Sequence, residues 1–101
     1  MTKKMDDEMD KKLKKITEYF GIETELMKMS EEIGELQNEC YKGHFVGGPS
    51  NIEDEVADVM VILLQIMLYF DADMEKVVDI IEGKIDRTIK RIEEGWYSKH
   101  R

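Results

Sequence analysis

The most hydrophobic stretch of the chain runs from Val59 to Phe70 and is interrupted only by Gln65. A helix at a protein surface has an apolar stripe and a polar face, whereas this stretch is apolar on all sides. It is shorter than the roughly 20 residues that cross a bilayer, so it predicts a helix surrounded by protein. We expect residues 52–70 to form the central helix of a bundle.

Apolar residues that recur every three or four positions predict three further helices. These cover residues 3–20, the segment between Thr24 and Gly43, and the segment between Asp73 and Gly95. Thr24 and Asp73 are candidate N-caps, because their side chains can accept a hydrogen bond from the first turn of a helix. The chain is therefore expected to be an all-α, four-helix bundle.

One loop is predicted at residues 43–50, where three glycines and the only proline of the chain occur. Its glycines do not have the spacing of a phosphate-binding loop. Ser50 and Glu53 have the spacing of a capping box, in which each side chain accepts a hydrogen bond from the other residue's backbone. This pair predicts the start of the central helix.

Length and composition restrict the kinds of protein that this chain can be. Its 101 residues are the size of one domain, which we expect to span residues 1–101. A net charge of −8 argues against binding to nucleic-acid polymers, because phosphate backbones attract basic surfaces. The single cysteine, Cys40, fits a reducing cytoplasm, and the N-terminal residues have no apolar export signal. We expect a cytoplasmic protein that does not enter a membrane.

A central helix that is apolar on all sides also bears on the oligomeric state. A lone bundle of four helices covers such a helix with difficulty, whereas a self-complementary dimer covers it more easily. We therefore expect a homo-oligomer.

Two groups of acidic residues carry the candidate chemistry. Glu31, Glu32 and Glu35 lie in the middle of the second predicted helix, and Glu55 and Asp58 lie near the start of the central helix. A helix dipole favours acids in a first turn, but it does not explain acids in mid-helix. The short loop predicts that the two helices pack antiparallel, which brings the two groups to a similar level.

Carboxylates brought together in this way need a counter-charge. Two of them about 4 Å apart repel by roughly 4 kcal/mol at an effective dielectric of about 20, so four together must share protons or bind a cation. Oxygen ligands favour Mg²⁺ or Mn²⁺, and the absence of an E-x-x-H motif disfavours a di-iron site. The alternative, that these acids form solvated helix faces, stays open at this point.

The acidic residues resemble the signature of the MazG-like nucleoside triphosphate pyrophosphohydrolases, E-E-x-x-E followed by E-x-x-D. The signature stands here as Glu31-Glu32-Ile33-Gly34-Glu35 and, after 19 residues, Glu55-Val56-Ala57-Asp58. The resemblance extends over residues 23–95. It implies an all-α homodimer or homotetramer that uses Mg²⁺ to hydrolyse NTPs or dNTPs to the monophosphate and pyrophosphate, for example in cleaning the nucleotide pool.

The same resemblance implies roles for single residues. The implied metal ligands are Glu32, Glu35, Glu55 and Asp58. Glu31 is the remaining acid of the motif and is expected to support the site or to orient water. The candidate catalytic residues are the three acids of the first half of the motif, Glu31, Glu32 and Glu35. The basic residues of the last helix are expected to bind phosphate oxygens, the arginines by bidentate contacts; they are Lys84, Arg87 and Arg91.

Two other functions stay open. A non-catalytic helical module, which oligomerises or binds a partner, could keep the acids as structure. Phosphoribosyl-ATP pyrophosphohydrolases and dimeric dUTPases share the implied fold, so the motif does not identify the base or the sugar of a substrate.

Overall fold

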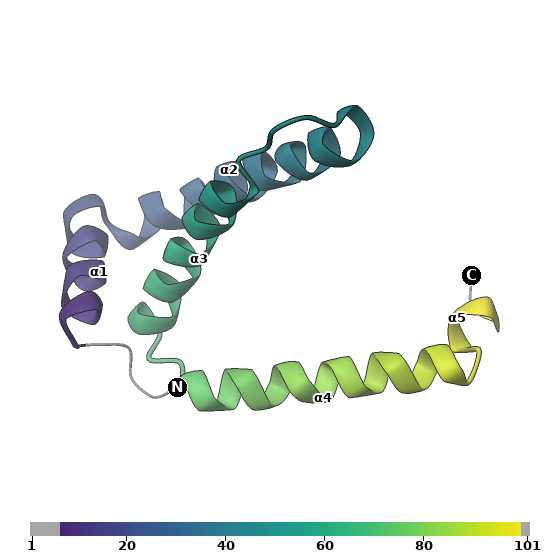
Figure 1. Ribbon diagram of the computed structural model, residues 1–101. Coiled ribbons are helices and arrows are strands. Elements are labelled where there is room, and N and C mark those ends of the chain that lie inside the picture. Colours follow the sequence, from purple (N-terminus) through teal and green to yellow (C-terminus); the bar gives the residue numbers. More distant parts are fainter. Residues whose placement is uncertain (1–6, 100–101) are drawn as a thin grey trace. The chain divides into compact units, whose positions relative to one another are not determined.

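The computed structural model describes residues 7–99, which form five α-helices and one π-helical turn (Figure 1). The elements in chain order are α1 (Asp7–Phe20), α2 (Ile22–Tyr41), the π-helical turn (Lys42–Val46), α3 (Ile52–Tyr69), α4 (Met74–Glu93) and α5 (Trp96–Lys99). The all-α prediction is confirmed. The predicted number of four helices is wrong, because the residues after Gly95 add α5. The predicted start of the first helix at residue 3 lies outside the described residues.

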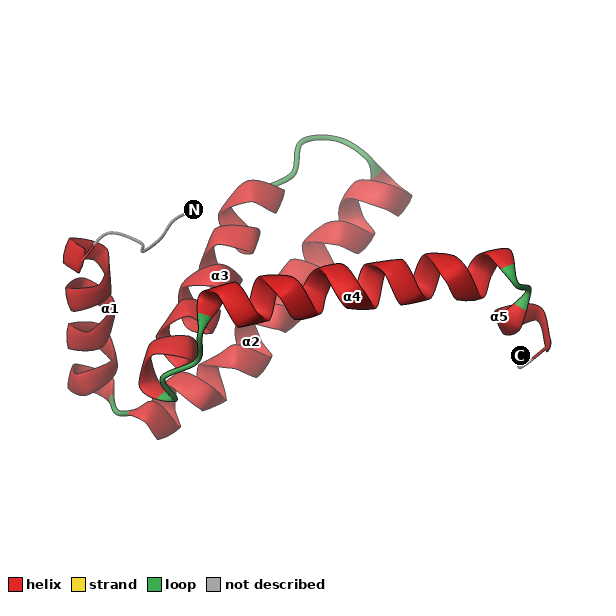
Figure 2. Ribbon diagram, turned by 90° about the horizontal axis from the view of Figure 1, so that it is seen from below, coloured by secondary structure: helices red, strands yellow, loops and turns green. Residues whose placement is uncertain are grey.

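The chain divides into two compact units. The first, Met1–Asp71, contains α1, α2 and α3, and in this unit α3 contacts both other helices (Figure 2). The second, Ala72–Arg101, contains α4 and α5. Among the helices of residues 7–99, none combines the length and hydrophobicity needed to cross a membrane.

The start of α2 differs from the prediction. Gly21 is its N-cap, with a φ of 90°, and Thr24 lies inside the helix. Such a φ is readily available to glycine and rare for other residues, so a single residue suffices to separate α1 from α2. The predicted cap at Thr24 is wrong because the turn at Gly21 already begins the helix.

The end of α2 also lies beyond the predicted stop. Helical structure continues through Gly43 as the π-helical turn and ends at Gly47, where φ is 86° and the backbone N–H donates to the Lys42 carbonyl oxygen at 3.0 Å. A glycine within a helix costs only about 1 kcal/mol relative to alanine, so Gly43 does not have to end one. The loop predicted at residues 43–50 is therefore confined to residues 47–51.

The helices α3 and α4 begin in different ways. Asn51 is the N-cap of α3 and its side chain makes no capping hydrogen bond, so the predicted capping box of Ser50 and Glu53 is wrong. The N-cap of α4 is confirmed as Asp73, whose Oδ1 accepts a hydrogen bond from the Glu75 backbone N–H at 2.9 Å.

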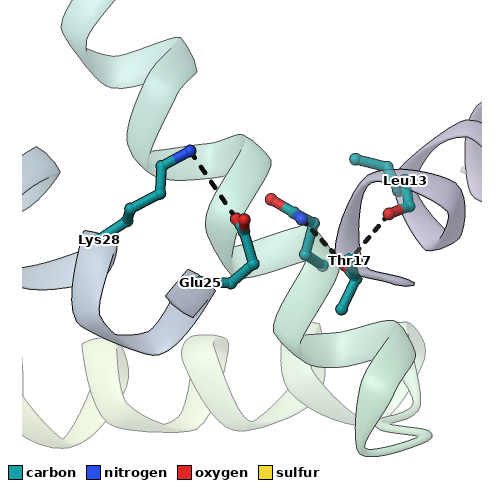
Figure 3. Close-up of polar contacts among 5 residues, drawn as sticks. Leu13, Thr17, Glu25 and Lys28 are labelled. Atoms are coloured by element: carbon teal, nitrogen blue, oxygen red, sulfur yellow. Dashed lines mark hydrogen bonds and ion pairs between the residues drawn. The ribbon is translucent and has the colours of Figure 1, made fainter. Parts of the chain in front are cut away.

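The buried centre of the first unit is unusually polar. Among the residues that the structure describes, Leu13 and Ile62 are its buried apolar side chains. Gln65 is only 2 % exposed, although it is the one polar residue of the hydrophobic stretch. The Gln65 Nε2 donates to the Thr17 hydroxyl at 2.9 Å, and that hydroxyl donates to the Leu13 carbonyl oxygen at 3.1 Å (Figure 3). These bonds satisfy polar groups whose burial would otherwise be unfavourable, and the bond from Gln65 to Thr17 joins α3 to α1.

Much apolar surface stays exposed on the other faces of the helices. On α3 the exposed residues include Met60, Val61, Leu63 and Tyr69. On α4 they include Val78, Ile81, Ile85, Ile89 and Ile92. Within the first unit α3 contacts α1 and α2, and the homo-oligomer that would cover further apolar surface stays a prediction.

The bond between α1 and α3 can be tested by substitution. Thr17→Val should lower the free energy of unfolding by about 1–3 kcal/mol, because the buried Gln65 amide loses its acceptor. Urea unfolding in the absence of metal would measure this loss. The matched control is Thr88→Val: the Thr88 hydroxyl makes the same type of bond, to the Lys84 carbonyl oxygen at 2.9 Å, but on an exposed face.

The double variant Thr17→Val with Gln65→Leu should recover part of the loss, because both hydrogen-bonding partners become apolar. A single Thr17→Val variant as stable as the wild type would show that the bond contributes nothing to stability.

Candidate metal centre

The candidate site lies where α2 and α3 run side by side (Figures 1 and 2). The helices are antiparallel, since Glu39 near the end of α2 contacts Asn51 at the start of α3, and Glu32 and Glu35 face Glu55 further from the loop. This is the arrangement that the short connection predicts, and it brings the two groups of acids together.

Three carboxylates converge in the described part of the chain. Glu32, Glu35 and Glu55 each offer one carboxylate oxygen, and these three oxygens lie within 4.8 Å of one another. Glu32 and Glu55 are half-buried and Glu35 is exposed. Oxygen atoms from two facing helices at this separation could ligate one hard cation. We call these residues the three-glutamate cluster.

The cluster leaves buried oxygens unpaired. Oε1 of Glu32 and Oε1 of Glu55 are both buried and have no hydrogen-bond partner among the described residues. Buried polar atoms nearly always have a partner, and a buried negative charge needs a compensating one. A divalent cation fits this donor set, because it would supply positive charge to the oxygens that lack a donor.

The electrostatics of the cluster favour retention of protons when no cation is present. Burial raises the pKa of the Glu32 carboxyl above its ordinary value of 4.5, and the charges of Glu35 and Asp58 raise it further. Burial also raises the pKa of Glu55, and the charges of Glu35 and Asp58 again add to the effect. Raised carboxyl pKa values are expected where like charges crowd together away from water.

Two acids of the motif lie outside the cluster. Asp58 is exposed and is not one of the three converging residues, although its charge contributes to the raised pKa values of Glu32 and Glu55. Glu31 is exposed on α2. Three of the four expected metal ligands thus come together, and Asp58 lies close enough to influence them.

The three basic candidates belong to the second unit. Lys84, Arg87 and Arg91 lie on α4, at spacings of three and four residues that place them along one helix face. The Arg91 guanidinium carbon lies 5.0 Å from the centre of the Trp96 ring, a geometry that stabilises the cation through the aromatic face. The phosphate-binding role of these residues stays a prediction.

Two acids with structural contacts did not stand out in the sequence. Glu25 is fully buried, and its Oε1 lies 4.0 Å from Lys28 Nζ, while neither carboxylate oxygen has a hydrogen-bond partner in the described part of the chain (Figure 3). Glu39 accepts a hydrogen bond from the Asn51 backbone N–H at 2.9 Å. The only local signal for either is a lysine three residues later, which is common on exposed helices.

A cavity of about 420 Å³ lies at the turn between α1 and α2, and its lining includes Thr17, Ile22, Gln65 and Leu68. No residue of the three-glutamate cluster lines it. The cavity is therefore a feature separate from the candidate metal centre.

No family model, curated protein or solved structure matches this chain. What the protein does must therefore be inferred from its own residues and from the motif that they form.

Proposed function

We propose that this chain is a Mg²⁺-dependent nucleotide pyrophosphohydrolase of the MazG-like kind, which hydrolyses NTPs or dNTPs to the nucleoside monophosphate and pyrophosphate. The observation that carries the proposal is the convergence of oxygens from Glu32, Glu35 and Glu55 within 4.8 Å. The resemblance of residues 31–35 and 55–58 to the family signature supplies the reaction and the cation.

The three-glutamate cluster would hold the cation, and Asp58 would complete the set of protein ligands. Mn²⁺ could replace Mg²⁺, because both prefer oxygen ligands. When bound, the cation supplies positive charge against the carboxylates and the triphosphate and makes a bound water more acidic. Without this charge, a chain with a net charge of −8 would repel its substrate.

The remaining chemistry falls to the side chains of the chain. A deprotonated glutamate of the motif accepts a proton from the attacking water, and Glu31 orients that water. The water oxygen bonds to the α-phosphorus while the bond from that phosphorus to the bridging oxygen breaks, so pyrophosphate leaves. Lys84, Arg87 and Arg91 bind phosphate oxygens, the arginines through paired N–H groups.

The proposal is tested by a product assay with a panel of NTPs and dNTPs, in Mg²⁺ and in EDTA. We expect pyrophosphate and the matching monophosphate in equal amounts with Mg²⁺, and neither in EDTA. The relative rates would rank the substrates, and a phosphoribosyl-ATP substrate belongs in the same panel. Release of orthophosphate alone would contradict the proposed reaction.

A second candidate function is a non-catalytic helical module that assembles with copies of itself. The exposed apolar residues of α3 and α4 favour it. It would be preferred if the protein neither turned over any nucleotide nor bound Mg²⁺. Both functions include a homodimer or homotetramer, and sedimentation of a compact monomer at micromolar concentration would contradict that part.

A further inference from the structure

Glu39 connects the end of α2 to the N-cap residue of α3. Its Oε2 accepts a hydrogen bond from the backbone N–H of Asn51 at 2.9 Å, across 12 positions of the chain. Its Oε1 lies 3.8 Å from Lys42 Nζ, and its side chain is only 14 % exposed. The carboxylate is therefore held between the two helices and does not extend freely into solvent.

The N-cap of a helix explains why this bond matters. In a capping box, a glutamate three residues into the helix accepts a hydrogen bond from the N–H of the N-cap residue. At α3 no such local pair forms, and Glu39 of α2 supplies the carboxylate from outside the helix. A negative charge at this position also interacts favourably with the partial positive charge of a helix N-terminus.

The same bond leads directly to the three-glutamate cluster. The Asn51 carbonyl oxygen accepts a hydrogen bond from the Glu55 backbone N–H at 3.0 Å, so Asn51 and Glu55 belong to the same first turn of α3. A sliding movement of this turn along α2 would displace Glu55 relative to Glu32 and Glu35. The hydrogen bond from the Asn51 N–H to the Glu39 carboxylate attaches this turn to α2 at the level of Asn51.

We propose that Glu39 is a positioning residue of the candidate metal centre, which fixes the register of α3 on α2 so that Glu55 faces Glu32 and Glu35. Its role in cation binding rests on the proposed function, whereas its effect on the register does not. The charge of Glu39 is among those that raise the pKa of Glu55. The negative charge of Glu39 near Glu55 is unfavourable by itself. The hydrogen bond from Asn51 offers a compensating reason for an acid at this position.

The test compares three variants. Glu39→Ala removes the acceptor, Glu39→Gln keeps a carbonyl acceptor and removes the charge, and Lys42→Gln removes the ion pair and keeps the hydrogen bond. Two properties are measured: the affinity for Mn²⁺ alone by calorimetry, and, in EDTA, the NMR signals of the Asn51 amide together with proton contacts between α2 and α3. Circular dichroism checks that helix content is retained.

In Glu39→Ala we expect Mn²⁺ affinity to fall by about tenfold, as is usual when a residue that orients a ligand is lost. The Asn51 amide should exchange faster with solvent, and the contacts between α2 and α3 near Glu55 should change. Glu39→Gln and Lys42→Gln should remain close to the wild type in both measurements.

Different failures have different meanings. If the wild type does not bind Mn²⁺, the proposed function fails, and the NMR measurements in EDTA still decide whether Glu39 sets the register. Unchanged helix contacts and amide exchange in Glu39→Ala would overturn the inference. A second outcome would also overturn the inference: Glu39→Gln loses Mn²⁺ affinity as strongly as Glu39→Ala, while its Asn51 amide stays protected from exchange. The lost negative charge, and not a changed register, would then explain the weaker binding.

Discussion

Glu55→Gln is expected to reduce Mg²⁺-dependent release of pyrophosphate by about 100-fold or more, since losing even an outer partner of a metal ligand costs about 10–100-fold. The same substitution should stabilise the metal-free protein at neutral pH. Burial and the charges of Glu35 and Asp58 raise the pKa of Glu55, which means that its deprotonated form is unfavourable in the fold. An amide of nearly the same shape removes that charge.

These opposite effects distinguish a metal ligand from a structural residue. A glutamate that mainly holds the fold together would lose stability and activity together when it is replaced. The matched control is Glu53→Gln, which removes an exposed acid from the same first turn of α3 and lies outside the three-glutamate cluster. We expect the control to change neither property appreciably.

The measurements are kcat/KM for pyrophosphate release and urea unfolding in EDTA. Retained turnover in Glu55→Gln would remove Glu55 from the set of metal ligands, and a large loss of stability would contradict the electrostatic interpretation.

The same loss of turnover, with helix content intact, is expected for Glu35→Ala and Asp58→Ala. Asp58 is the sharper case, because it is exposed and lies outside the three-glutamate cluster. Loss of turnover in both variants would support a site with four protein ligands. Loss in Glu35→Ala alone would indicate that three carboxylates suffice.

The features that the sequence predicted well are local ones. Helix existence follows from the spacing of apolar residues, and the antiparallel packing of α2 and α3 follows from their short connection. The convergence of Glu32, Glu35 and Glu55 combines these two: an i, i+3 pair on one helix and an acid at a similar distance from the loop on the next. No knowledge of distant contacts is needed for this part of the site.

The features that were missed depend on distant contacts. Asn51 is the N-cap of α3, and its N–H donates to the Glu39 carboxylate of α2, whereas the local pattern of Ser50 and Glu53 pointed to the wrong position. The buried Gln65 amide has a hydrogen-bond acceptor in Thr17, which lies on α1 and is 48 positions away in the sequence. A lone polar residue in a hydrophobic stretch was the available signal, but it does not identify the partner.

The contribution of Glu32 and Glu55 to the free energy of unfolding of the metal-free protein should rise as the pH falls from neutral towards 4.5. Both carboxyl groups have raised pKa values in the folded chain, against an ordinary value of 4.5. Between 4.5 and the raised values, the folded state binds more protons than the unfolded state, so the free energy of unfolding decreases as pH increases. The two deprotonated carboxylates lower the free energy of unfolding by the full amount at pH values above the raised pKa values. This destabilisation is relieved as the pH falls through those pKa values.

Other carboxylates also titrate in this range, so the informative quantity is a difference. We would measure urea unfolding in EDTA between about pH 7 and about pH 5 for the wild type and for the double variant Glu32→Gln with Glu55→Gln, since linkage operates over the interval between the two pKa values. The advantage of the double variant should be largest at neutral pH and should shrink on acidification. A difference that does not depend on pH would contradict the raised pKa values.

A bound cation should reverse this pH dependence, because it requires the deprotonated carboxylates that the metal-free fold disfavours. The stabilisation by Mn²⁺ should therefore grow with pH. On acidification, the apparent affinity for Mn²⁺ should fall by about tenfold per pH unit for each proton that the cation must displace. Calorimetry in buffers of different ionisation enthalpy would count these protons. Release of protons in the wild type, and of fewer in Glu55→Gln, would tie the raised pKa values to the cation site; binding without proton release would place the cation elsewhere.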